Sequence, residues 1–280
     1  MKLGKFEINI LHDGFFRLDG GAMFGVVPKV IWDRLEPADD HNRILLAVNP
    51  VLVRTGEHNI LIDTGMGSKY EAKELEIYQI ELPRGLIPEL HRLEVPPEKI
   101  DYVINSHLHF DHIGGNTYKD LDGAIKPTFS NARYVMQKGE FEDAVTPSAR
   151  THASYNPDDV VPLQSTGQIL LIDGDTDILP GIRARVTGGH TRNHQIIEIE
   201  SEGEKALFLA DLIPTSSHIK VPYVMGYDLF PADTAKFKEE LLKEAVQGNY
   251  LLIFEHSPRV KAGRVTETGG IINFMPETFD

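Results

Sequence analysis

The chain has 280 residues, 41% of them hydrophobic, which is enough for one large domain or two small ones. It contains no cysteine, and this excludes a disulfide framework, thiolate zinc sites and a cysteine nucleophile. The formal net charge is −14, from 42 acidic and 28 basic residues, with no run of Lys or Arg, so a nucleic-acid partner is not expected.

The N-terminal forty residues combine an alternating segment with an apolar stretch. Residues 6–11 alternate between apolar and polar and predict a strand. Residues 17–37 contain several glycines and are expected to form a loop, yet they carry Met23, Phe24 and Trp32. A loop this apolar must cover the core, a partner subunit or a substrate pocket. The sequence shows no signal-peptide core and no long apolar span, so we expect a cytoplasmic protein without a membrane partner.

The remaining pattern predicts mostly strands. They are expected at residues 44–54, 59–63, 102–106, 132–136, 169–172, 182–187, 196–200 and 206–210, with the last at 250–255. Helices are expected at 82–93, 138–145 and 233–247, the last with Asp233 as N-cap and Gly248 as stop. Residues 146–168 are polar and suggest an insertion over a surface. Because no linker or low-complexity segment divides the chain, we expect one α/β domain over 1–280, built on two sheets with helices outside.

Four metal-ligand side chains follow the strand expected at 102–106. Within six residues the chain places His107, His109, Asp111 and His112. Imidazole and carboxylate are ligands that zinc, iron, cobalt and manganese accept. The first two histidines can hold one metal, and the aspartate and third histidine can reach a second. Gly114 and Gly115 follow and are expected to let the backbone turn sharply.

Three more ligand-type residues stand where other predicted strands end. His190 follows Gly188-Gly189, Asp211 ends the apolar strand at 206–210, and His256 ends the strand at 250–255. An aspartate at the end of an apolar strand is costly unless something pairs with it, and a metal is a suitable partner. His194 either orients one of these ligands or is an ordinary hydrogen-bonded strand residue.

Together these residues resemble the ligand set of the metallo-β-lactamase superfamily, in order over nearly the whole chain, and Asp63-Thr64-Gly65 resembles its N-terminal strand-end aspartate. The resemblance implies an αββα four-layer sandwich with two divalent metal ions at one rim of the sheets. Zinc is expected first, with iron, cobalt or manganese as alternatives. By analogy one ion takes His107, His109 and His190, the other takes Asp111, His112 and His256, and Asp211 bridges both.

Within the superfamily the chain resembles quorum-quenching N-acyl homoserine lactonases and their methyl-parathion-hydrolase relatives. The resemblance rests on Phe110 in the His-rich run and on the segments at residues 20–28 and 210–215. Several such lactonases carry a substrate-contacting tyrosine three residues after the bridging aspartate, where this chain has Pro214. The group that polarises the substrate carbonyl is therefore open, with His218, Tyr223 and Tyr227 as candidates. Many also carry Pro-Gly where Arg192-Asn193 stand here.

This resemblance implies that a hydroxide held between two metals, about 3.5–4 Å apart, opens the lactone ring. Asp111 is the candidate catalytic residue that passes a proton to the leaving oxygen. An apolar wall along the acyl chain could be formed by Met23, Phe24, Val26 and Trp32, with Tyr223 and Met225 opposite. These residues could equally fill the core or a dimer contact. A homodimer is expected from the related lactonases. The alternatives are a phosphotriesterase or arylesterase and a glyoxalase II-like thioesterase acting on the same metals.

Overall fold

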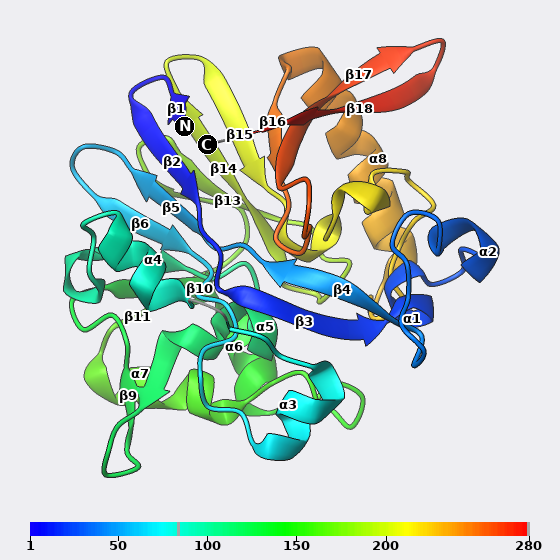
Figure 1. Ribbon diagram of the computed structural model, residues 1–280. Helices are drawn as coiled ribbons and strands as arrows, with labels where there is room; N and C mark the ends of the chain where they lie inside the picture. Colours follow the sequence, from blue (N-terminus) through cyan, green and yellow to red (C-terminus); the bar gives the residue numbers. More distant parts are fainter. Residues whose placement is uncertain (83–84, 279–280) are drawn as a thin grey trace.

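The computed structural model describes residues 1–82 and 85–278. Two seven-stranded sheets face each other, and helices cover their outer faces (Figure 1). This confirms the predicted αββα sandwich. Of the helix expected at 82–93, the part from 86 onward is present as α4 (Leu86–Arg92), while positions 83 and 84 lie outside the described residues.

The first sheet is built mainly from the N-terminal half of the chain. Its strands, in spatial order, are β1 (Lys2–Leu3), β2 (Phe6–Ile10), β5 (Val51–Arg54), β6 (Asn59–Ile62), β7 (Tyr102–Ile104), β10 (Arg133–Gln137) and β11 (Ile169–Ile172). The last four run parallel to one another, so their carboxyl ends meet at one rim.

The second sheet is built from the C-terminal half. Its strands are β12 (Thr176–Leu179), β13 (Ile182–Val186), β14 (Gln195–Ser201), β15 (Glu204–Phe208), β16 (Leu251–Ile253), β17 (Ala262–Thr268) and β18 (Ile271–Glu277). The prediction that the strand near residue 250 is the last one was wrong, since β17 and β18 follow it. Their hairpin projects from the sheet with Ile271 and Met275 exposed, so it lacks the apolar pattern of a buried strand (Figure 1).

Three apolar clusters fix the layers. Between the sheets, Ile62 and Val135 pack in one cluster with Phe208 and Ile253. Leu90 of α4 lies in a second cluster on the outer face of the first sheet, which α6 (Lys138–Val145) and α7 (Val161–Thr166) also cover. In the third, α8 (Pro231–Gly248) packs Leu241, Leu242 and Ala245 against the second sheet. Removal of these side chains from water stabilises the sandwich.

Helix α8 begins and ends close to the predicted positions. Its N-cap is Phe230, and Pro231 occupies the first turn, where a missing N–H costs nothing, so Asp233 lies inside the first turn rather than at the cap. The helix ends at Gly248, and the left-handed C-cap residue is Asn249, one position beyond the expected stop at Gly248.

The loop expected at residues 17–37 is largely ordered secondary structure. It contains the end of β3 (Gly14–Asp19), then α1 (Gly20–Phe24) and α2 (Lys29–Trp32). Gly20 is needed for packing, because a Cβ there would lie 2.4 Å from the Trp32 ring. Met23, Phe24, Val27 and Trp32 of this segment are buried in a cluster that also contains Phe16, Leu46 and Met225. Helices α1 and α2 lie at the end of a two-stranded ribbon (Figure 1).

The strand expected at 44–54 is two strands in two different sheets. β4 (Arg43–Val48) pairs with β3, and β5 joins the first sheet after a break at Asn49-Pro50. Pro50 has no N–H to donate to a ladder, so the strand divides there.

Short elements complete the chain. They are α3 (Ala72–Tyr78), α5 (Phe110–Ile113), β8 (Thr117–Lys119), β9 (Ile125–Pro127) and the 3-10 turns η1 (Pro97–Lys99), η2 (Gly114–Asn116), η3 (Pro157–Asp159), η4 (Ala210–Leu212) and η5 (Ser216–His218). The expected insertion at 146–168 thus contains η3 and the whole of α7. Over the described ranges, no helix has the length and apolarity that crossing a bilayer requires.

Candidate metal centre

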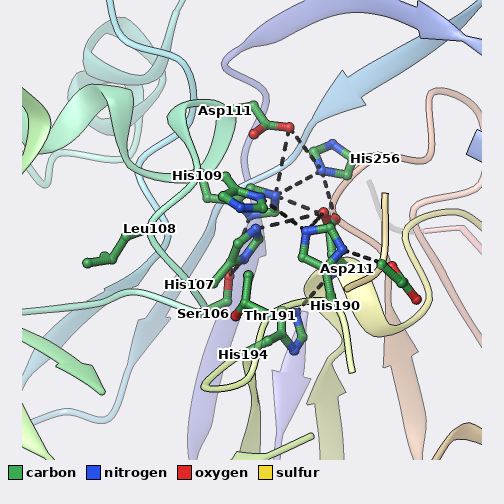
Figure 2. A network of polar contacts seen from close by, with 12 residues as sticks. Ser106, His107, Leu108, His109, Asp111, His190, Thr191, His194, Asp211 and His256 are labelled. Atoms are coloured by element: carbon green, nitrogen blue, oxygen red, sulfur yellow. Dashed lines mark hydrogen bonds and ion pairs between the residues drawn. The ribbon is translucent and has the colours of Figure 1, made fainter. Parts of the chain in front are cut away.

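Seven side chains of the predicted ligand set converge at one rim of the sandwich (Figure 2). They come from segments that follow strands in both sheets. His107 to His112 follow β7, His190 lies after β13, Asp211 lies in η4 after β15, and His256 follows β16. The two sheets present their strand ends at the same rim, so residues far apart in sequence meet there.

The side chains form two donor groups. The first donor group comprises His107, His109, His190 and Asp211, and the second comprises Asp111, His112 and His256; within each group the candidate ligand atoms lie within 4.8 Å of one another. In the first, His190 Nε2 lies 3.1 Å from His109 Nδ1. In the second, His256 Nε2 lies 3.1 Å from His112 Nε2.

Asp211 belongs to the first group and also faces the histidines of the second. Its Oδ2 is 3.0 Å from His190 Nε2 and 3.8 Å from His107 Nε2, both in the first group. Its Oδ1 is 3.1 Å from His256 Nε2 and 3.5 Å from His112 Nε2, both in the second. One carboxylate oxygen therefore faces each group, as a bridging ligand requires.

Metal binding requires neutral imidazoles, and the hydrogen bonds on the outer side of three rings then leave the inward nitrogen of each with a lone pair. Nδ1 of His190 donates to Asp228, Nδ1 of His112 to Asp63, and Nδ1 of His256 to the Ala47 carbonyl, each at 2.9 Å. A neutral imidazole has one N–H, so each Nε2 is then an acceptor. His107 Nε2 and Asp211 Oδ1 are buried and have no hydrogen-bond partner among the residues that the structure describes. Converging acceptors of this kind fit a divalent cation.

The pKa shifts point to the same demand for positive charge. Burial and the neighbouring imidazoles hold the pKa of His107 and of His109 well below the ordinary value, so both rings are neutral. Burial lowers the pKa of His112, but Asp211 and Asp111 outweigh it and raise that pKa well above its usual range. Burial raises the pKa of Asp211, yet the surrounding histidines lower it by more, so the carboxylate is ionised.

Asp63 and Asp228 are buried carboxylates that orient the histidines. Asp63 adopts a left-handed backbone conformation after β6 and accepts hydrogen bonds from Ser106 N at 2.7 Å and Ser106 Oγ at 2.6 Å, besides that from His112. Asp228 lies far along the chain, after η5, and was not predicted, because no local pattern links it to His190. Carboxylates in this position fix the ring tautomer and raise the basicity of the ligand nitrogen.

His194 orients Asp211 rather than serving as an ordinary strand residue. Its Nε2 accepts a hydrogen bond from the Asp211 backbone N–H at 3.1 Å, and its Nδ1 lies 2.7 Å from Thr187 Oγ1. Of the two roles that the sequence left open for His194, the geometry favours the one in which it orients a candidate ligand.

Gly114 and Gly115 have a different role from the sharp turn that was expected. Gly114 has helical backbone angles at the C-cap of α5. A Cβ there would lie 2.0 Å from the Met66 carbonyl oxygen, and one at Gly115 would lie 2.2 Å from the Thr64 carbonyl oxygen. The two glycines therefore let the metal-ligand turn pack closely on the loop after β6.

A cavity of about 280 Å³ opens above the donor groups. Its floor includes His109, Asp111, His190, Asp211 and His256. Its walls include Leu18, Met23, Leu46, Tyr78, Phe110, Arg150, Ser154, Met225, Tyr227 and Leu229. The walls are mainly apolar, with Arg150, Thr151, Ser154 and two tyrosines as polar exceptions, which is typical of a site for a small amphipathic molecule.

Of the residues expected along the substrate, Met23 and Met225 line this cavity. Phe24 is fully buried and stacks on Trp32 and His218, so all three rings lie in the core beneath the wall. His218 Nε2 donates to the Met23 carbonyl at 2.9 Å, and burial lowers the pKa of His218 to about 3. Tyr223 packs against the same cluster. These corrections arise because a buried aromatic and a pocket-lining aromatic have the same local sequence pattern.

The comparisons with known proteins agree with this geometry. The sequence profile of the metallo-beta-lactamase superfamily matches residues 43–256. An N-acyl homoserine lactonase from Bacillus cereus is 30% identical over 219 residues, which is 72% of this chain and 80% of the relative. The crystal structure of a probable metal-dependent hydrolase from Staphylococcus aureus superimposes with a TM-score of 0.91 at 32% identity, covering 100% of this chain and 99% of the other.

A third comparison concerns the fold alone. The dizinc quorum-quenching lactonase AidC superimposes with a TM-score of 0.82 at 22% identity, covering 100% of this chain and 97% of AidC. The chain belongs to the metallo-beta-lactamase superfamily. Within it, the chain is a hydrolase whose relatives include N-acyl homoserine lactonases.

Proposed function

We propose that this protein is an N-acyl homoserine lactonase that uses two divalent metal ions, zinc first among them. The observation that carries the proposal is the position of Asp211 between two donor groups on the floor of a largely apolar cavity. The 30% identity to a Bacillus cereus lactonase supports the substrate class. His107, His109 and His190 would hold one ion and Asp111, His112 and His256 the other, with Asp211 shared.

The metals, when bound, would supply a nucleophilic water of lowered pKa and polarise the substrate carbonyl. The chain's own groups then handle the proton and the orientation of the substrate. Asp111 lines the cavity, and its Oδ2 lies 3.6 Å from His256 Nε2, at the boundary between the donor groups and the open space. Asp111 could therefore take the proton that the attacking water releases and pass it to the ring oxygen as the lactone C–O bond breaks.

Tyr227 is the candidate donor to the substrate carbonyl. Of the three candidates that the sequence left open, it is the one that lines the cavity. Burial and the nearby Asp19 raise the pKa of its phenol to about 12, so it stays protonated and can donate a hydrogen bond at neutral pH.

Replacing Tyr227 by Phe should lower kcat/KM for lactone opening by about tenfold to a hundredfold, since a hydrogen bond to a group that gains charge is lost. Steady-state kinetics on N-decanoyl homoserine lactone would measure this. Tyr118→Phe is the matched control, because Tyr118 is an exposed tyrosine that does not line the cavity. Unchanged kcat and KM in Tyr227→Phe would remove the phenol from the reaction.

The proposed function is tested by a comparison of three substrates on protein of measured metal content. We expect N-decanoyl homoserine lactone to be hydrolysed faster than paraoxon or S-lactoylglutathione, with two metal ions per chain. Preference for paraoxon would favour a phosphotriesterase or arylesterase, and preference for the thioester a glyoxalase II-like enzyme. Either result would be consistent with the metal centre and would overturn the proposed lactone substrate.

A homodimer and a cytoplasmic location remain part of the proposal as predictions. Val26, which precedes α2, and Val30, which lies within it, are apolar and exposed and could contribute to a contact between subunits. Sedimentation of the purified protein would decide the oligomeric state.

A further inference from the structure

One buried carboxylate outside the donor groups contacts several of the segments that carry them. Glu140 lies in α6, is 1% exposed and does not line the cavity. Its Oε1 accepts hydrogen bonds from Leu108 N at 3.2 Å and Tyr155 Oη at 2.9 Å. Its Oε2 accepts one from Thr191 Oγ1 at 2.7 Å. Both oxygens are thus occupied by donors from three separate segments.

Each of the three donors is tied to a residue of the first donor group. Leu108 stands between His107 and His109 in the turn after β7, and Thr191 directly follows His190 (Figure 2). The Tyr155 ring packs edge-on against the His109 imidazole, with 4.9 Å between centroids. Since β7 and β13 belong to different sheets, Glu140 joins ligand loops of both halves of the sandwich.

The second donor group has different supports. His112 is held by Asp63 through its Nδ1, and His256 by the Ala47 carbonyl through its Nδ1. The hydrogen bonds that Glu140 accepts within the described ranges do not come from Asp111, His112 or His256. Removing the Glu140 contacts should therefore loosen one group and leave the other in place.

We propose that Glu140 is a positioning residue that sets the metal affinity of the first donor group independently of the second. This inference rests on the proposed two-metal centre, and it does not depend on which ester or lactone is hydrolysed. The three hydrogen bonds keep His109 and His190, which are 81 residues apart in sequence, at the spacing that one ion needs. Outer contacts of this kind typically change metal affinity about 10–100-fold.

The test uses Thr191→Val, which removes a single hydrogen bond to Glu140 and keeps the size of the side chain. Zn²⁺ affinity is measured by chelator competition in two backgrounds. In His256→Ala, which leaves the first group complete, Thr191→Val should weaken Zn²⁺ binding about 10–100-fold. In His109→Ala, which leaves the second group complete, Thr191→Val should change the Zn²⁺ affinity by less than about threefold.

Thr117→Val is the matched control, because Thr117 is also buried and donates one hydrogen bond, to the Asp158 carbonyl, away from both donor groups. In the His256→Ala background, Glu140→Met removes all three contacts and should weaken Zn²⁺ binding more than Thr191→Val does. Glu140→Gln should bind Zn²⁺ more tightly than Glu140→Met and less tightly than the protein with Glu140. Thermal unfolding of each metal-free variant separates loss of fold from loss of metal.

Equal weakening in both backgrounds, or none in either, would overturn the positioning role. A protein that opens no lactone but shows the selective loss of Zn²⁺ would overturn the proposed function and leave this inference standing. The two proposals can therefore fail separately.

Discussion

Asp211→Ala is expected to lose bound metal and hydrolase activity together. Asp211 is the carboxylate whose two oxygens face the two donor groups, at 3.0 Å from His190 Nε2 and 3.1 Å from His256 Nε2. Without Asp211, the imidazoles would have to hold two cations without the carboxylate charge that faces both of them. We expect activity to fall by more than the about 10²–10³-fold that loss of one electrostatic group costs.

The measurement is metal content by elemental analysis beside kcat/KM on the same preparation. Chelator-treated parent protein gives the activity of the metal-free state, and Asp122→Ala, at an exposed position between β8 and β9, is the control for a lost aspartate. Full metal content in Asp211→Ala would contradict the bridging role.

Asp111→Asn is expected to lower kcat by about 10²-fold or more while KM changes by about threefold or less. Asn has the shape of Asp and keeps one oxygen toward the second donor group, but it has no carboxyl proton to give. Asp111 lines the cavity and is 7% exposed, so its carboxyl can meet both a bound substrate and solvent. A group that acts only on the departing oxygen should affect turnover more than binding.

This prediction is checked by steady-state kinetics with metal content determined for every sample. Asp122→Asn serves as its control. Unchanged turnover with two metals bound would remove Asp111 from the proton transfer. A fall in kcat that is matched by loss of metal would instead make Asp111 a ligand without a proton-transfer role.

The fold was predictable largely because its strands are short, apolar and bounded by clear breaks. The predictions failed where the local sequence pattern does not reveal the role of a segment in the tertiary structure. Residues 17–37 look like a loop because of their glycines, yet Gly20 is small in order to pack on Trp32. The hairpin of β17 and β18 was missed because one of its strands is mostly exposed and therefore carries few buried apolar residues.

The candidate site was predictable in its donors and not in its surroundings. His107 to His112 form a dense run, and His190, Asp211 and His256 each stand after a strand, so the residues themselves carry the pattern. Asp228 and Glu140 carry no such mark. Each is a single acidic residue in an ordinary segment, and its role comes only from the histidine or loop that it contacts.

The amino-acid sequence by itself determined the superfamily and the candidate metal ligands that the structure brings together, because ligand chemistry and strand ends are local properties. Only the tertiary structure decided how the donors group, what orients them and which side chains line the cavity. His112 and His256 meet across 144 residues of sequence, and Phe24 turns into the core while Met23 beside it reaches the cavity. Such choices depend on the packing of the two sheets against each other, which brings together residues that no local pattern connects.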